Sequence, residues 1–207
     1  MKMIWTVAVV VVLAAALAVA MWARSAFSAS MVRAAGENTA SLYDLEVRTL
    51  EGEPAPLGQY RGQVALVVNT ASKCGLTPQY EGLEALWREL RVEGLVILGF
   101  PSNDFMNQEP GSAEDIRLFC SENYDVTFPL FEKVHVKGDE KSEVFQVLTA
   151  ELEEPTWNFT KYLVSKQGRV IARFGPRTAP DHPRLRDAIE RELAATPGPR
   201  PGDDASR

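Results

Sequence analysis

One cysteine lies where a thiol could act as a nucleophile. Residues 69–78 (NTASKCGLTP) place Cys74 between a run of apolar, β-branched residues and the start of an amphipathic segment. Unpaired N–H groups and the dipole at a helix N-terminus favour an anion, so we expect the thiolate of Cys74 to be favoured there. Lys73 adds a neighbouring positive charge. The alternative interpretation is that Cys74 is only a small residue in a turn.

Metal and nucleic-acid chemistry have little support. The chain has two cysteines and two histidines, Cys74, Cys120, His135 and His182, and their spacing matches neither a CxxC…CxxC nor an HExxH metal site. We expect His135 to lie in a strand and His182 at the surface, neither acting as a general base. With 22 Lys and Arg against 28 Asp and Glu, the net charge of −6 provides no basic stripe for nucleic acid.

The first 24 residues are predicted to be a signal-anchor or a signal peptide. Residues 4–23 contain no charged side chain, and about 20 helical residues span roughly 30 Å, the thickness of a bilayer core. Trp5 and Trp22 lie near its ends, where interfacial aromatic residues are common. We favour an uncleaved hydrophobic helix; cleavage after the small residues at 26–30 is the alternative. Either predicts a domain outside the cytoplasm, in the periplasm if the source is bacterial.

The remaining chain divides into a linker, one domain and a tail. Residues 25–39 are small, polar and aperiodic, which is typical of a linker. Residues 196–207 are rich in Pro, Gly and Asp, as in a disordered tail. The working domain is therefore expected over residues 40–195, which is long enough to bury a core.

Within residues 40–195, apolar runs alternate with helical periodicity. Residues 63–71 and 95–100 are continuous apolar runs, typical of strands buried on both faces. Thr77 and Pro78, Ser112 with Asp115, and Ser142 resemble helix starts. Residues 161–165 and 169–174 indicate a hairpin, and residues 182–193 a last helix. A parallel βαβ unit followed by a hairpin and a closing helix predicts a thioredoxin-like α/β fold, with a mixed sheet flanked by helices.

Three segments resemble the signatures of one enzyme family. NTASKCGLTPQY, FPSNDFMNQEPG and EPTWNFTKYLV are similar, in this order, to three motifs of the glutathione peroxidases. The likeness extends over about residues 42–193, almost all of the expected domain. It implies a thiol peroxidase that protects against oxidative stress by reducing hydrogen peroxide and organic hydroperoxides through a cysteine sulfenic acid.

The resemblance assigns roles to four residues. The peroxidatic position falls on Cys74, and the family's glutamine, tryptophan and asparagine fall on Gln108, Trp157 and Asn158. Their amide and indole N–H groups could donate hydrogen bonds to the thiolate and the peroxide oxygens. No prosthetic cofactor is implied, only a reducing thiol: glutathione, thioredoxin or a protein thiol.

Each of these assignments has a plainer alternative. Gln108 could be a surface loop residue and Trp157 a core aromatic residue. The sequence Asn158-Phe159-Thr160 also reads as a glycosylation site, and a sugar on Asn158 would be incompatible with catalysis.

The sequence departs from the family pattern at several positions. Relatives often have Cys and Gln where this chain has Ser102 and Asp104, and an inward-facing Asp104 would disfavour a thiolate. In relatives that use thioredoxin, a resolving cysteine precedes the TFP segment, and counting back from this segment places it at Ser121. Cys120 is one residue away, which turns its side chain to another face of a helix. We therefore expect Cys120 to be a core residue, with a resolving role as the alternative. Only about twenty residues separate Val136 from Trp157, so the long insertion that tetrameric relatives carry before the third motif is absent. This implies a monomer.

A second function class remains to be weighed against the enzyme. A thioredoxin-like module could sense oxidation and pass it to a partner protein without turnover. The CGLT sequence that starts at Cys74 lacks the second thiol of a CxxC oxidoreductase, so that version of the module has little support.

Overall fold

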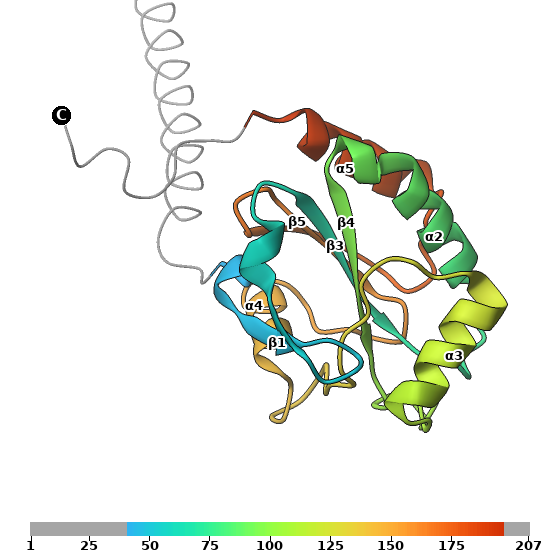
Figure 1. Ribbon diagram of the computed structural model, residues 1–207. Coiled ribbons are helices and arrows are strands. Elements are labelled where there is room, and N and C mark those ends of the chain that lie inside the picture. The colour runs from blue at the N-terminus through green and yellow to red at the C-terminus, as the bar shows by residue number, and fades with distance from the viewer. Residues whose placement is uncertain (1–40, 197–207) are drawn as a thin grey trace, which may run out of the picture. The chain divides into compact units, whose positions relative to one another are not determined.

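Two buried parallel strands lie side by side in the main sheet, one of them inside it and the other at its edge (Figure 1). In the computed structural model, which describes residues 41–196, β3 (Val64–Thr70) pairs in parallel with β4 (Leu95–Pro101). Every residue of both strands is buried, because the sheet is covered on both faces. The two strands predicted over residues 63–71 and 95–100 are confirmed to within one residue at each end.

A hairpin completes the mixed sheet. β5 (Lys161–Val164) runs antiparallel to β3, and β6 (Val170–Phe174) runs antiparallel to β5, giving the strand order β4-β3-β5-β6. The predicted hairpin is therefore confirmed. A second, two-stranded sheet of β1 (Glu46–Arg48) and β2 (Pro54–Pro56) was not expected from the sequence.

Helices cover the two faces of the sheet unequally. The core on one face contains apolar side chains of α2 (Gln79–Leu90), α3 (Ala113–Tyr124) and α5 (Pro183–Ala194). The core on the other face contains those of the short α4 (Glu143–Leu148). Three 3-10 helices complete the described elements: Leu42–Asp44, Leu57–Tyr60 and Arg91–Glu93. This arrangement confirms the thioredoxin-like α/β fold.

The helix starts agree with the sequence only in part. The capping box between Ser112 and Asp115 is present at the start of α3, and Ser142 is the N-cap of α4. At α2 we expected Thr77 as the N-cap and Pro78 as the first helical residue; this is wrong by one position, because Pro78 is the N-cap. The Thr77 hydroxyl is engaged before the helix: it donates to the Ala71 carbonyl at 2.8 Å and accepts from the Cys74 N–H at 3.1 Å.

Of the two histidines, one is where we expected it. His182 is exposed at the N-cap of α5, where its Nδ1 accepts the Arg184 N–H. The prediction that His135 lies in a strand is wrong. Pairing in this part of the chain stops at the isolated bridges of Leu130 and Phe131, and the His135 carbonyl instead accepts the N–H of Ser142 across a turn.

The expected membrane segment at residues 1–24, the linker at 25–39 and the tail from residue 197 onward lie outside the described residues. Among residues 41–196, no helix is long and apolar enough to cross a membrane.

A buried lysine holds the first turn of α2 against the loop that precedes α5. Lys161 has no exposed surface, and its Nζ donates to Gln79 Oε1, to the Thr178 carbonyl at 2.7 Å and to the Pro176 carbonyl at 3.5 Å. Gln79 Nε2 donates to the same Pro176 carbonyl at 2.8 Å. Burial penalises the charged amine and lowers the pKa of Lys161 to about 7. The turn that begins α2 is therefore fixed by a group that titrates far from its usual range.

Replacing Lys161 by Met should change how stability depends on pH. The unfolded lysine keeps a pKa near 10.4, so between about pH 9 and pH 7 it carries a proton that the folded lysine lacks. The folded state then loses up to about 1.4 kcal/mol of stability for each unit by which the pH falls. The free energy of unfolding of the parent, relative to Lys161→Met, should therefore rise with pH. Urea unfolding at several pH values measures this, with Lys166→Met as the control for a partly exposed lysine. A pH-independent difference would contradict the prediction.

Candidate active site

Cys74 lies in the turn between the central strand β3 and the N-terminus of α2. Its side chain is 8% exposed, and its Sγ accepts the N–H of Leu76 at 3.4 Å. The Thr77 hydroxyl holds the Cys74 N–H, and the Thr77 N–H donates to the Cys74 carbonyl at 3.0 Å. The N–H groups of Cys74, Leu76 and Thr77 are therefore all engaged within the turn, and that of Leu76 donates to the sulfur.

The loop that follows β4 contacts the Cys74 turn directly. The Lys73 N–H donates to the Gln108 carbonyl at 2.9 Å, and the Ser72 N–H donates to Glu109 Oε2 at 2.9 Å. Glu109 is 1% exposed. Burial raises the pKa of the Glu109 carboxyl, and the hydrogen bonds from Ser72 oppose that rise. Gln108 and Glu109, which are consecutive in the second motif, therefore hold Ser72 and Lys73, the two residues before the thiol.

Asn158 joins the third motif to the second. Its Nδ2 donates to Gln108 Oε1 at 3.0 Å. Asn158 is fully buried, and its Oδ1 accepts no hydrogen bond from any described residue. This bond uses the Gln108 Oε1 and fixes which way the Gln108 amide points. The Nε2 hydrogens of Gln108 donate to no described residue and are therefore left for a ligand. Full burial also excludes a sugar on Asn158 in the folded domain, which removes the glycosylation alternative.

Trp157 is partly buried beside the same loop. Its ring packs against Phe105 with 5.5 Å between ring centroids. Sequence reasoning therefore identified four residues, Cys74, Gln108, Trp157 and Asn158, whose backbones or side chains the fold connects through three motifs far apart in the chain.

Asn69 was missed by the sequence analysis. Its Oδ1 accepts the Thr160 N–H at 3.0 Å, its Nδ2 donates to the Trp157 carbonyl at 3.2 Å, and its own carbonyl accepts the Phe159 N–H. These bonds hold a turn in which Phe159 has φ of 65°, a left-handed conformation that is unfavourable for a bulky side chain. The available signal was an amide side chain in an otherwise apolar buried strand, since such a group needs partners.

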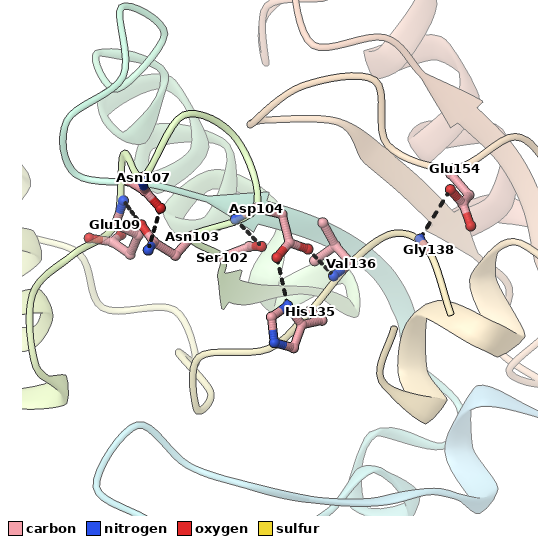
Figure 2. A network of polar contacts seen from close by, with 9 residues as sticks. All are labelled: Ser102, Asn103, Asp104, Asn107, Glu109, His135, Val136, Gly138 and Glu154. Atoms are coloured by element: carbon pink, nitrogen blue, oxygen red, sulfur yellow. Dashed lines mark hydrogen bonds and ion pairs between the residues drawn. The ribbon is translucent and has the colours of Figure 1, made fainter. Parts of the chain in front are cut away.

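The other two notable residues of the sequence analysis lie as follows. Asp104 accepts hydrogen bonds from the His135 ring and the Val136 N–H, so both of its oxygens are used by the segment after Phe131 (Figure 2).

Cys120, on α3, is 1% exposed and belongs to the same core cluster as Ile116. Burial raises the pKa of the Cys120 thiol to about 11, against a lowering hydrogen bond from Tyr80. In this state Cys120 is therefore a neutral thiol in the core.

Residues 41–196 contain no group of three or more His, Cys, Asp or Glu side chains placed to hold a metal ion. The geometry of this part of the chain shows a buried thiol whose turn is hydrogen-bonded to the loop of Gln108 and Glu109.

The α/β fold places the chain among the thioredoxin-like proteins, with Cys74 in the turn before α2. The solved thiol:disulfide interchange protein of Chlorobium tepidum has the same fold, with a TM-score of 0.57 and 14% identity over 76% of this chain and 98% of that one. The structure of Trgpx in its apo form matches with a TM-score of 0.64 and 34% identity, over 78% of this chain and 100% of that one.

Sequence comparison identifies the family. The family model described as glutathione peroxidase matches residues 42–149. The glutathione peroxidase homolog BsaA of Halalkalibacterium halodurans is 48% identical over 158 residues, which are 74% of this chain and 99% of that protein. The glutathione peroxidase-like peroxiredoxin of Schizosaccharomyces pombe is 50% identical over 73% of this chain and 98% of that protein. The chain belongs to the glutathione peroxidase family and is a thiol-dependent peroxidase, as its three motifs predicted.

Proposed function

We propose that Cys74 is the peroxidatic residue and that it reduces hydrogen peroxide and organic hydroperoxides. The thiolate sulfur attacks the distal peroxide oxygen; an S–O bond forms, the O–O bond breaks, and the leaving oxygen takes a proton to become water or an alcohol. The observation that carries this proposal is the hydrogen-bonded contact of the Cys74 turn with Gln108, which in turn accepts a hydrogen bond from Asn158.

The amide pair gives the reaction its oriented groups. Asn158 occupies Gln108 Oε1, so the Gln108 Nε2 hydrogens are free to donate to the thiolate or to the leaving oxygen. Asn158 is fully buried, so its role in this proposal is to orient Gln108. In this proposal the Trp157 indole N–H is a third donor. Donors fixed in place before the reaction stabilise developing negative charge without reorganisation.

The proposed substrates include organic hydroperoxides because of the name of one relative. The hydroperoxy fatty acid reductase of Synechocystis is 45% identical over 68% of this chain and 90% of that protein. We keep the expectation of a monomer as part of the proposal, since only α4 and its flanking loops lie between Val136 and Trp157.

The catalytic assignment predicts graded effects of four substitutions. Cys74→Ser should abolish peroxide consumption and retain the fold, because a hydroxyl of similar size is a far poorer nucleophile. Gln108→Ala and Asn158→Ala should each slow oxidation by peroxide by about 100- to 1,000-fold, the scale found when one oriented donor is lost. Trp157→Phe tests the indole N–H alone. Rapid-mixing measurements with hydrogen peroxide decide this.

Two outcomes would contradict the assignment. Retained turnover in Cys74→Ser would exclude Cys74 as the nucleophile, and parent rates in the three other variants would exclude the donors. Steady turnover with a supplied thiol supports the enzyme over a redox sensor, which would consume one equivalent of peroxide per chain and then stop.

We propose further that an external thiol, glutathione, thioredoxin or a protein thiol, reduces the sulfenic acid while Cys120 stays in the core. Burial and the raised pKa of Cys120 disfavour its thiolate, which is the attacking species in disulfide formation. A Cys74–Cys120 bridge needs the two Cα atoms within about 7 Å, so the fold would have to bring them that close.

Cys120→Ser separates the core role from the resolving role. A buried hydroxyl beside Ile116 should lower the free energy of unfolding by about 1 to 3 kcal/mol, while turnover with a small thiol continues. Chemical unfolding and steady-state kinetics measure the two effects. If mass spectrometry finds a Cys74–Cys120 disulfide in the oxidised parent, and the variant loses turnover with thioredoxin, then the resolving role replaces the core role.

We also propose that residues 4–23 hold the catalytic domain at a membrane, on its extracytoplasmic side. The uncharged segment and its terminal tryptophans support this. Alignment with the Halalkalibacterium relative uses 99% of that protein but 74% of this chain, so the alignment leaves about a quarter of this chain without a counterpart.

Fractionation tests the membrane proposal. The full chain should stay in the membrane pellet after a carbonate wash with its first residues intact, while a version lacking residues 1–24 should be in the supernatant. If the source is bacterial, protease added to intact spheroplasts should digest the domain. Full-length, uncut protein in the supernatant would contradict the proposal, and a processed, soluble form would replace the anchor with a cleaved signal peptide.

A further inference from the structure

The loop over residues 102–109, which carries Gln108, is closed upon itself by short-range hydrogen bonds. Asn103 Oδ1 accepts the Glu109 N–H at 2.8 Å, and Asn103 Nδ2 donates to Asn107 Oδ1 at 3.2 Å. Met106 and Asn107 both have φ of 53°, so the loop turns through two left-handed residues. Such a conformation persists only where surrounding contacts hold it.

Three consecutive residues of a second segment hold two consecutive residues of this loop. The His135 Nδ1 bonds to Asp104 Oδ1 at 2.7 Å, and the Val136 N–H donates to Asp104 Oδ2 at 2.7 Å (Figure 2). The Lys137 Nζ lies 4.6 Å from the centroid of the Phe105 ring. We call these contacts of residues 135–137 with Asp104 and Phe105 the loop clamp.

The loop clamp is connected to the proposed donors by short steps. Phe105 packs on the Trp157 ring, and its carbonyl accepts the Gln108 N–H at 3.2 Å. Gln108 then contacts both the Cys74 turn and Asn158. A displacement of Asp104 and Phe105 would therefore reach two of the groups that the proposed function uses.

We propose that Asp104 and His135 are positioning residues for the reaction with peroxide: their ion pair fixes the 102–109 loop so that Gln108 and Trp157 face the thiol. The inference rests on the proposed function of those two residues. The Asp104 side chain is 9% exposed and that of His135 is 60% exposed. A nearly buried carboxylate that keeps both oxygens paired holds its loop more firmly than an exposed pair would, because water competes less for it.

The pair also makes the loop clamp sensitive to pH. The hydrogen bond and the charge of Asp104 raise the pKa of His135 above 6.5, and Glu140 acts in the same direction. Lys137 is the neighbouring cation, placed over Phe105. Since the folded pKa is the higher one, the stabilisation is fully present below the unfolded value of about 6.5 and is lost as pH rises through the folded value. The loop clamp is strongest at mildly acidic pH.

The test compares His135→Ala and Asp104→Asn with His182→Ala in the full-length reduced protein. His182 is the matched control, because it is the other histidine of the chain and caps α5. Two rates are measured across about pH 5.5 to 8: oxidation by hydrogen peroxide in a single turnover, and alkylation of Cys74 by iodoacetamide followed by mass spectrometry. Alkylation reports the thiolate and needs no aligned amide donor.

We expect His135→Ala to slow oxidation by peroxide about three- to thirtyfold at mildly acidic pH, less than the loss of a donor itself, and to leave alkylation within about twofold of the parent. The ratio of the two rates should fall as pH rises in the parent and in His182→Ala, and should become flat in His135→Ala. Asp104→Asn keeps the shape of the side chain and should reproduce the flat ratio, which carries the test if His135→Ala does not fold.

The inference would be overturned if both variants reacted with peroxide at the rate of the parent. It would also be overturned if alkylation of Cys74 slowed as much as oxidation by peroxide, because the effect would then lie on the Cys74 turn. Failure of the proposed function is distinguishable: Gln108→Ala would then react at the parent rate whatever His135→Ala does.

Discussion

The parallel pairing of β3 with β4 is the constraint on which the site depends. Thr70 pairs with Pro101 at the carboxyl ends of the two strands, and the Ser102 N–H donates to the Thr70 carbonyl at 2.9 Å, so the chains leave the sheet side by side. The Cys74 turn and the 102–109 loop are the two continuations of this pair. Their contact through the Lys73 N–H and the Gln108 carbonyl follows from the strand register, as at the carboxyl edge of other parallel sheets.

The third motif reaches the same edge through the other neighbour of β3. β5 runs antiparallel to β3, so the turn that precedes β5 lies where β3 ends. Asn69, the residue before the last one of β3, holds that turn by both of its side-chain atoms and by its carbonyl. One central strand therefore positions all three motifs, and both polar atoms of the buried Asn69 side chain have backbone partners.

The sequence predicted what is encoded locally. The apolar runs predicted β3 and β4, because a strand covered on both faces does not alternate with polar residues. The capping box of Ser112 predicted the start of α3, because both of its residues lie within three positions of each other. Cys74, Gln108, Trp157 and Asn158 could be predicted as site residues because each motif is continuous in the chain.

The contacts that were not predicted join residues distant in the chain. Asp104 could not be oriented from the sequence, since its partners lie about thirty residues away at His135 and Val136. The same holds for the bonds of Asn69 to the turn before β5 and for the burial of Lys161 against Gln79 and Thr178. A lysine in a strand sequence is usually exposed, and only the packed loop before α5 shows why this one is not.

The role of Cys74, whose sulfur gives two electrons to peroxide and takes up one of its oxygen atoms, is tested most directly by adding one equivalent of hydrogen peroxide to the reduced protein. The products are trapped with a reagent for sulfenic acid and mapped by mass spectrometry. We expect one peroxide to be consumed per chain and the trapping reagent to be found on Cys74 before Met106 or Cys120 is modified. Consumption of peroxide with Cys74 still alkylatable as a thiol, and oxidation found elsewhere, would contradict it.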